Sequence, residues 1–193
     1  MAARRLCIGL TGRMASGKGE LVLILNGYGF QYVSLSDIVH REAAKIQPAI
    51  SRGQMQDLGN RLRKEGGAGI LGKMVRELIE AAEPSPWVID GIRNPAEVAE
   101  LKKMAGFVLL GIQAEVPIIL ARLKERGRST DVVAEEEMLT SLEREWGDGE
   151  PDGGQQVGRC LAMADFTIAN NGSLQALKTG LDEVLKKIGA GHE

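Results

Sequence analysis

The chain has 193 residues, of which 44% are hydrophobic, so it can bury the core of one substantial domain but not of two. Its formal net charge of −2 argues against a basic face for nucleic acid and against a polybasic segment for anionic membranes. No apolar run approaches the ~18 residues that span a bilayer, and no leader precedes the first predicted strand, so we expect a cytoplasmic protein. Cys7 and Cys160 lie in apolar surroundings without close cysteine or histidine partners, which favours buried free thiols over a disulfide or zinc site.

Hydrophobic runs and turn residues predict strands and helices that alternate along the chain. Short apolar runs predict five strands, over 5–10, 31–34, 87–90, 107–112 and 166–169. Helices are expected over 20–25, 38–46, 117–123 and 174–188, and from Pro95 to near Gly106. Two more are expected within 51–82, and another is expected to end at Trp146. Ser36-Asp37 and Ser173 are predicted N-caps, and the glycine-rich segment 147–155 is predicted to be a mobile loop.

Strands that are apolar throughout and separated by helices indicate a parallel sheet covered on both faces. The predicted fold class is therefore α/β, a three-layer αβα sandwich with a five-stranded parallel sheet and right-handed crossovers. We expect a single domain over residues 1–193, with a helical acceptor-binding insert at about 38–82 and a lid at about 127–155.

The segment Gly12-Arg13-Met14-Ala15-Ser16-Gly17-Lys18-Gly19 follows a predicted strand and opens a predicted helix. In that context the spacing Gly-x-x-x-x-Gly-Lys is typical of a P-loop, whose backbone N–H groups surround phosphate oxygens while the lysine reaches the β- and γ-phosphates. The alternative is a glycine-rich turn with an exposed lysine. The predicted phosphate-binding residues are Gly12, Arg13, Ala15, Ser16, Gly17, Lys18, Gly19 and Glu20.

ATP and Mg²⁺ are the expected cofactors, but Gly19 stands where most such loops have a serine or threonine that binds the metal. Asp90 ends a buried strand predicted to lie beside the strand that leads into the loop. Its carboxylate should therefore face the nucleotide and could bind Mg²⁺ through water. The alternative for Asp90 is a structural role in capping the following turn.

The ending Gly17-Lys18-Gly19 resembles adenylate kinase and other nucleoside monophosphate kinases. Segments 37–42, 88–94, 122–129 and 164–174 are similar, in the same order, to segments of dephospho-CoA kinases and adenylate-kinase-related proteins. This resemblance implies that Asn171 and Gly172 lie beside the adenine. Asp90-Gly91-Ile92-Arg93 departs from dephospho-CoA kinases and looks more like the nucleoside monophosphate kinases.

Several charged residues are candidates for binding the acceptor or assisting the transfer. Asp37 could orient the acceptor or take its proton, or could simply cap a helix. Arg41, one helical turn later, could bind an acceptor phosphate or face solvent. Arg93, directly after a strand end, is the stronger candidate for the acceptor phosphate.

Three arginines, Arg122, Arg126 and Arg128, lie near the end of one predicted helix and in the turn after it. Cations around the equatorial oxygens of a transferring phosphoryl group stabilise its charge, and a lid that carries them would also exclude water. The alternative is an amphipathic helix with a basic, solvated face.

These patterns predict an enzyme that transfers the γ-phosphate of ATP–Mg²⁺ to a small nucleotide, with a ribo- or deoxyribonucleoside monophosphate favoured as acceptor. Transfer to the 3′-hydroxyl of dephospho-CoA is an alternative. A second alternative is a nucleotide-binding regulatory protein without kinase activity. It is suggested by Glu20, whose charge beside the phosphates should weaken ATP binding unless the side chain turns away. The oligomeric state cannot be derived from these patterns.

Overall fold

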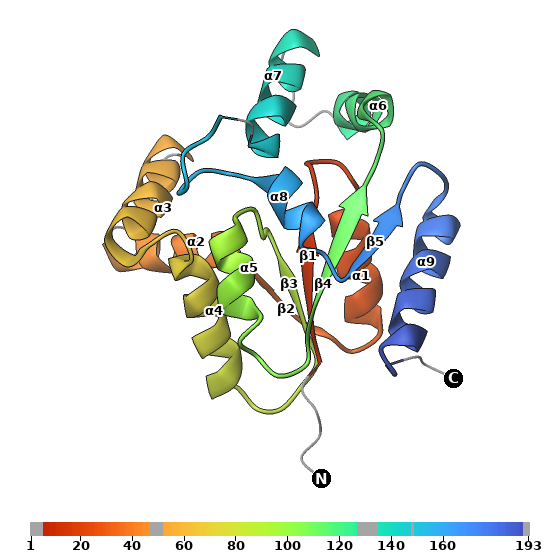
Figure 1. Cartoon of the computed structure of the whole chain (residues 1–193), viewed down its shortest axis with the longest axis horizontal. Coiled ribbons are helices and arrows are strands. Elements are labelled where there is room, and N and C mark those ends of the chain that lie inside the picture. Colours follow the sequence, from red (N-terminus) through yellow and green to blue (C-terminus); the bar gives the residue numbers. More distant parts are fainter. Residues whose placement is uncertain (1–5, 47–51, 127–134, 148, 191–193) are drawn as a thin grey trace.

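The computed structural model describes residues 6–46, 52–126, 135–147 and 149–190. Within them a five-stranded sheet has the order β2-β3-β1-β4-β5, and every neighbouring pair is parallel. The strands are β1 Cys7–Thr11, β2 Gln31–Ser34, β3 Trp87–Asp90, β4 Phe107–Gln113 and β5 Phe166–Ala169. The predicted α/β class and five-stranded parallel sheet are confirmed (Figure 1).

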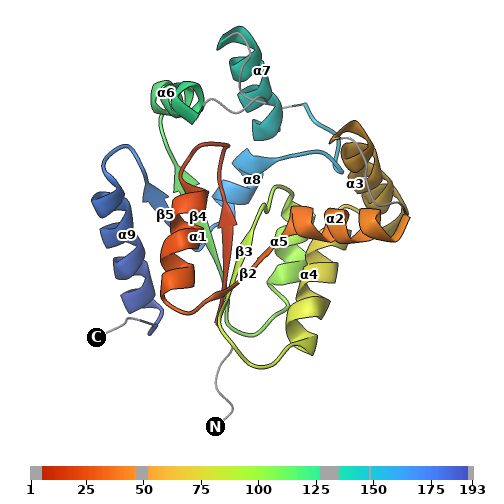
Figure 2. The ribbon, with the colours of Figure 1, turned by 180° about the vertical axis from the view of Figure 1, so that it is seen from behind.

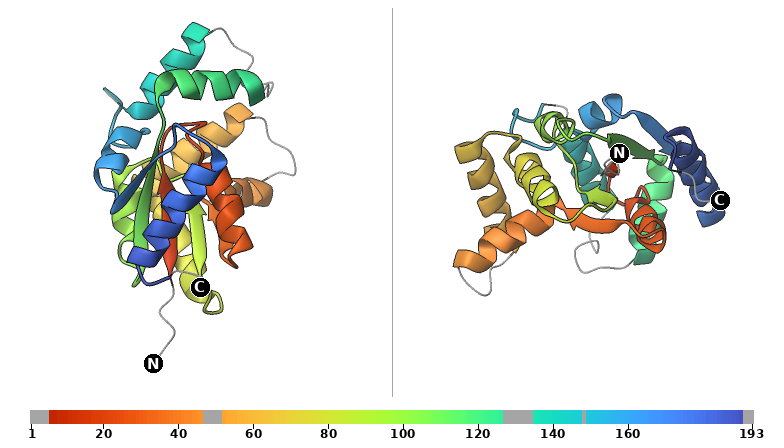
Figure 3. Two further views of the ribbon diagram at one scale, coloured as in Figure 1. Left: turned by 90° about the vertical axis from the view of Figure 1, so that its right-hand side faces the viewer. Right: turned by 90° about the horizontal axis from the view of Figure 1, so that it is seen from below.

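Helices cover both faces of this sheet and also lie beyond its carboxyl edge. They are α1 Lys18–Gly27, α2 Leu35–Ile46, α3 Arg52–Gly66, α4 Ile70–Ala81, α5 Pro95–Leu101, α6 Val116–Arg126, α7 Glu135–Trp146, α8 Val157–Ala162 and α9 Leu174–Lys187. Helices α4, α5 and α8 lie on one face, and α1 and α9 lie on the opposite face (Figures 1 and 2). Helices α6 and α7 stand above the carboxyl ends of the strands, as the side view in Figure 3 shows.

The core is divided by the sheet into two layers of buried apolar side chains. Residues such as Ile89, Leu71 and Leu109 fill the layer under α4, α5 and α8, whereas Leu10, Leu21 and others fill the layer under α1 and α9. All five residues of β1 are buried, because this central strand has a neighbour on each side and helices above and below. Such burial explains why β1 is mostly apolar rather than alternating.

The start of α2 differs from the prediction, which placed the N-cap at Ser36-Asp37. The helix begins at Leu35, directly after β2. The Ser34 hydroxyl accepts the N–H of Asp37 at 3.0 Å, and the Asp37 carboxylate accepts the N–H of Ser34 at 3.0 Å. This reciprocal pair is a capping box, so Ser34 is the cap and Asp37 lies inside the first turn. The predicted N-cap at Ser173 is confirmed by a side-chain hydrogen bond, and Asn94 caps α5 in the same way.

Other helix boundaries also shift. Helix α5 ends at Leu101 instead of near Gly106, and α6 extends to Arg126 instead of Leu123. The short helix α8 was not predicted, since its six residues are fewer than the two or three turns that reveal a helical period. Helices α3 and α4 and most of α2 lie within the segment 38–82, for which a helical insert was predicted.

The segment after α7, predicted to be a mobile loop, has no helix or strand among its described residues. Two of its carbonyl groups, those of Asp152 and Gly154, accept hydrogen bonds from the side chain of Asn94 at 2.7 and 2.8 Å. The amide of Gln156 donates to the carbonyl of Arg93 at 2.7 Å. The loop is thereby attached to the turn that follows β3.

None of the helices in the described part of the chain is both long and apolar enough to cross a membrane.

Both cysteine side chains are buried and are not joined in a disulfide, as the sequence predicted. Burial raises the pKa of the Cys160 thiol from 9.0 to about 12. Since the thiolate is the reactive form, we expect the native protein to react with a disulfide reagent such as DTNB at least about tenfold more slowly than the unfolded chain. Counting released thiolate before and after adding guanidinium chloride tests this. Rapid labelling of two thiols in the native protein would contradict the buried placement.

Candidate active site

The loop between β1 and α1 has a backbone that only glycine can adopt at two positions. Gly12 and Gly17 have φ angles of 148° and 110°, and Ala15 between them has φ 54°. A Cβ atom on Gly12 would lie 2.2 Å from the carbonyl oxygen of Ile112, and one on Gly17 would lie 2.1 Å from Asn170 Nδ2. Both glycines therefore allow close approach to neighbouring strand ends as well as the turn itself.

Lys18 begins α1 and folds back over the loop. Its Nζ donates to the carbonyl oxygens of Gly12 at 2.6 Å and Arg13 at 2.8 Å. Burial lowers the pKa of Lys18, while the carboxylates of Asp90 and Glu145 act in the opposite direction. The ammonium group thus lies at the mouth of a glycine-rich turn and at the N-terminus of a helix, where anions are favoured.

The remaining loop residues differ in their surroundings. The Ser16 hydroxyl is buried and has no hydrogen-bond partner within the described part of the chain. Gly19 has open space where a side chain would begin, and Glu20 is exposed to solvent. An oxygen ligand at position 19 would therefore fit, but glycine supplies none. The exposure of Glu20 leaves its charge to be screened by water.

Asn170, at the end of β5, holds the loop from the side. Its side-chain amide donates to the carbonyl of Ser16 at 2.8 Å, and its own N–H donates to the carbonyl of Gln113 at 2.7 Å. From the sequence, the neighbouring Asn171 and Gly172 were predicted instead. Asn171 bonds to Glu115, at the start of the connection to α6, through both its amide oxygen and its amide nitrogen at 2.9 Å.

A cavity of about 1070 Å³ opens beside Lys18. Asp90 and Arg93, from the end of β3 and the turn after it, line the same cavity. Helices α2 and α3 and the loop 150–155 form much of the remaining wall, to which β2, α4 and α7 also contribute. Of the sequence-predicted residues, Lys18, Asp90 and Arg93 are therefore brought together in one space.

The Asp90 carboxylate accepts the N–H of Gly91 at 2.7 Å, and it is close enough to Lys18 to influence the pKa of that lysine. No group of three metal-binding side chains occurs among the residues that the structure describes. A carboxylate such as Asp90 near a phosphate loop fits Mg²⁺, which commonly binds proteins through one or two carboxylates and takes its other ligands from phosphates and water.

The other predicted residues lie in different places. Asp37 is engaged in the cap of α2, and Arg41 on the same helix is exposed and does not line the cavity. Arg122 donates to the carbonyls of Ala15 at 3.4 Å and Asn170 at 3.0 Å, so it bridges the loop and the end of β5.

Of the remaining two predicted arginines, Arg126 ends α6 and is exposed, yet its charge contributes to lowering the pKa of Lys18. Arg128 lies outside the described residues.

Arg63, on α3, lines the cavity and was not selected from the sequence. Its Nη2 lies 3.4 Å from Glu97 Oε1, and the second oxygen of Glu97 accepts the N–H groups of Arg93 and Asn94 at 2.9 and 3.0 Å. Burial raises the pKa of Glu97, and Arg63 opposes that rise. The buried carboxylate thereby connects α3 to the turn that carries Arg93.

Glu145 and Trp146 end α7 and contact the phosphate loop from above. The Met14 N–H donates to Glu145 Oε2 at 2.7 Å, and the Arg13 guanidinium lies 4.3 Å from the centre of the Trp146 ring. A cation stacked on an aromatic face is attracted to it. Neither residue was selected as a site residue, because nothing in the local sequence of α7 indicates contact with a loop about 130 positions earlier.

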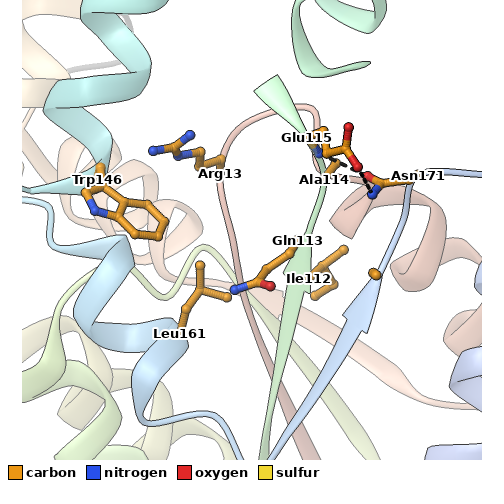
Figure 4. Close-up of a pocket in the computed structure, with 9 residues that line it drawn as sticks. Arg13, Ile112, Gln113, Ala114, Glu115, Trp146, Leu161 and Asn171 are labelled. Atoms are coloured by element: carbon orange, nitrogen blue, oxygen red, sulfur yellow. Dashed lines mark hydrogen bonds between the residues drawn. The ribbon is translucent and has the colours of Figure 1, made fainter. Parts of the chain in front are cut away.

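A second, smaller cavity of about 260 Å³ lies between Trp146, Leu161 of α8 and the ends of β4 and β5. Figure 4 shows Arg13 extending toward Trp146 at its upper side, and Gln113 and Leu161 facing one another lower down.

Comparison with known proteins identifies the family of the chain and its fold. Residues 11–139 match a family model described as an AAA domain. A UPF0200 protein from Methanoregula boonei is 32% identical over 179 residues, which cover 92% of this chain and 94% of that protein. Another from Methanoculleus marisnigri is 30% identical and covers 96% of this chain and 98% of its own length.

Solved structures show the same fold at low identity. A shikimate kinase from Bacteroides thetaiotaomicron has a TM-score of 0.62 at 12% identity, with 95% of this chain and 98% of that chain covered. A dephospho-CoA kinase from Campylobacter jejuni has a TM-score of 0.52 at 19% identity, with 96% and 98% covered. The fold is that of P-loop kinases. The match to the family model shows that the chain belongs to the family described as an AAA domain. Its similarity to the two relatives shows that it also belongs to the UPF0200 proteins.

Proposed function

We propose that this chain is a phosphotransferase that moves the γ-phosphoryl group of ATP to a small nucleotide, most readily a ribo- or deoxyribonucleoside monophosphate. The observation that carries the proposal is the shared cavity: Lys18 of the phosphate loop, Asp90 and Arg93 line one space of about 1070 Å³. Donor and acceptor phosphates could therefore meet in it, as in-line transfer requires.

In this mechanism the attacking atom is an oxygen of the acceptor phosphate. It forms a bond to the γ-phosphorus as the bond between that phosphorus and the β–γ bridging oxygen breaks, and ADP leaves with the bond's electrons. Lys18 binds the β- and γ-phosphate oxygens, and Arg93 holds the acceptor phosphate. Mg²⁺, held at Asp90 through water, would supply further positive charge to the phosphates.

Arg122 and Arg126 are proposed to stabilise the charge of the transferring group. The same charge-stabilising role remains a prediction for Arg128. Asn171 and Gly172 are proposed to border the adenine, and Arg41 to contact the acceptor from the edge of α2.

The position of Asp37 bears on the choice of acceptor. A phosphate oxygen is already ionised at neutral pH and needs no base, whereas a ribose hydroxyl must lose a proton. Asp37 was the candidate base, and its carboxylate already accepts the N–H of Ser34. This engagement favours a monophosphate over the 3′-hydroxyl of dephospho-CoA, which is retained as the alternative acceptor because of the structural similarity to a dephospho-CoA kinase.

A coupled assay of ADP release, with ATP–Mg²⁺ and each common nucleoside monophosphate, deoxynucleoside monophosphate and dephospho-CoA in turn, tests this proposal. We expect turnover with one acceptor at roughly 1 per second or faster. Turnover with dephospho-CoA alone would select the alternative. ATP binding without turnover on any acceptor would support a nucleotide-responsive regulatory protein and contradict the kinase.

A further inference from the structure

Glu145 is a buried carboxylate that faces the phosphate loop. Its side chain is only 2% exposed. One oxygen accepts the Met14 N–H at 2.7 Å, and the other lies 3.9 Å from Arg93 Nε and has no hydrogen-bond partner in the described part of the chain. Burying a carboxylate is costly unless cations and N–H groups surround it. Glu145 therefore uses groups that could otherwise receive an anionic ligand.

The end of α7 fixes this side chain firmly. Trp146, the next residue, stacks on Arg13, so two successive residues of α7 contact two successive residues of the loop. Gly158 makes room for the indole, since a Cβ atom there would lie 2.7 Å from the ring. These contacts hold Glu145 over the loop, whereas an exposed side chain could rotate freely.

The charge of Glu145 also reaches Lys18. It opposes the effect of burial on the pKa of that lysine, as does the charge of Asp90. A loop N–H, the P-loop lysine and Arg93 thus all interact with one carboxylate. These are the kinds of group that bind the terminal phosphate of a nucleoside triphosphate.

We propose that Glu145 takes the place of a terminal phosphate against the loop and makes the chain discriminate against nucleoside triphosphates relative to diphosphates. A γ-phosphate would bring a second negative charge to the groups that already interact with Glu145. The Glu145 carboxylate must therefore move away before the γ-phosphate can bind. A diphosphate, one group shorter, leaves Glu145 in place. The inference rests on the nucleotide site of the proposed function and names Glu145 as its specificity-determining residue.

The test is Glu145→Gln, which removes the charge but keeps an oxygen that can accept the Met14 N–H. Affinities for ADP and the non-hydrolysable triphosphate AMP-PNP, both with Mg²⁺, are measured by calorimetry on the full chain. Removing a like charge at close range should tighten AMP-PNP binding by about tenfold and change ADP binding by about twofold or less. Glu143→Gln is the matched control, because Glu143 is exposed on the same helix.

The outcomes separate the inference from the proposed function. An unchanged ratio of the two affinities in Glu145→Gln, or weaker AMP-PNP binding, would overturn the inference while leaving a nucleotide-binding protein. The same gain in Glu143→Gln would overturn it too, since that gain would be a general effect of charge. If neither wild type nor variant bound either nucleotide, the proposed function itself would fail and the inference with it. Thermal unfolding without nucleotide verifies that each variant folds.

Discussion

Replacing Lys18 with alanine should lower kcat for phosphoryl transfer by about a thousandfold, because it removes the cation that reaches the β- and γ-phosphates as negative charge moves between them. In the structure the ammonium lies directly over the loop, 2.6 and 2.8 Å from the carbonyls of Gly12 and Arg13. Steady-state turnover with the acceptor found in the screen measures the effect.

The fold should survive this substitution. A buried ammonium costs desolvation energy, which the substitution removes along with the two hydrogen bonds. The melting temperature is therefore expected to change little. Lys187→Ala, on the exposed side of α9, is the control and should retain full turnover. Wild-type turnover in Lys18→Ala would contradict the assignment of the phosphate loop.

The sheet and the phosphate loop could be predicted because their signals are local. Short apolar runs predict strands directly, so Trp87–Asp90 and Phe166–Ala169 were bounded correctly without knowledge of their neighbours. The spacing of Gly12 and Gly17 alone likewise predicts the phosphate loop, because its turn requires φ angles that other residues avoid. The choice of Asp90 followed from the same reasoning, since carboxyl ends of parallel strands line sites.

The parts that were missed depend on contacts between distant segments. Glu145 is an ordinary acidic residue in an amphipathic helix until α7 is placed over the loop. Arg63 and Glu97 are 34 positions apart and acquire significance only when α3 packs beside the turn after β3. The error at Asp37 had another origin. Ser34, Ser36 and Asp37 are all good capping residues, and only the end of β2 decides which of them begins the helix.

Replacing Arg93 with alanine should raise KM for the acceptor by about a hundredfold and change KM for ATP by about threefold or less. Loss of a charge-assisted pair with a phosphate, worth about 3 kcal/mol, corresponds to the larger effect. Arg93 is suited to this role because its side chain is 41% exposed and lines the cavity, while its N–H is fixed by Glu97 at 2.9 Å. Initial rates over a grid of ATP and acceptor concentrations give both constants.

Arg41→Ala provides the comparison that makes this result informative. Arg41 and Arg93 were both candidates for the acceptor phosphate, but only Arg93 lines the cavity that contains Lys18. Arg41→Ala should therefore raise the acceptor KM far less. A larger effect from Arg41 would mean that α2 moves toward the acceptor during binding. An equal effect of Arg93→Ala on both substrates would remove Arg93 from the acceptor site and assign it to the donor phosphates, beside the carboxylate of Glu145 that it already faces at 3.9 Å.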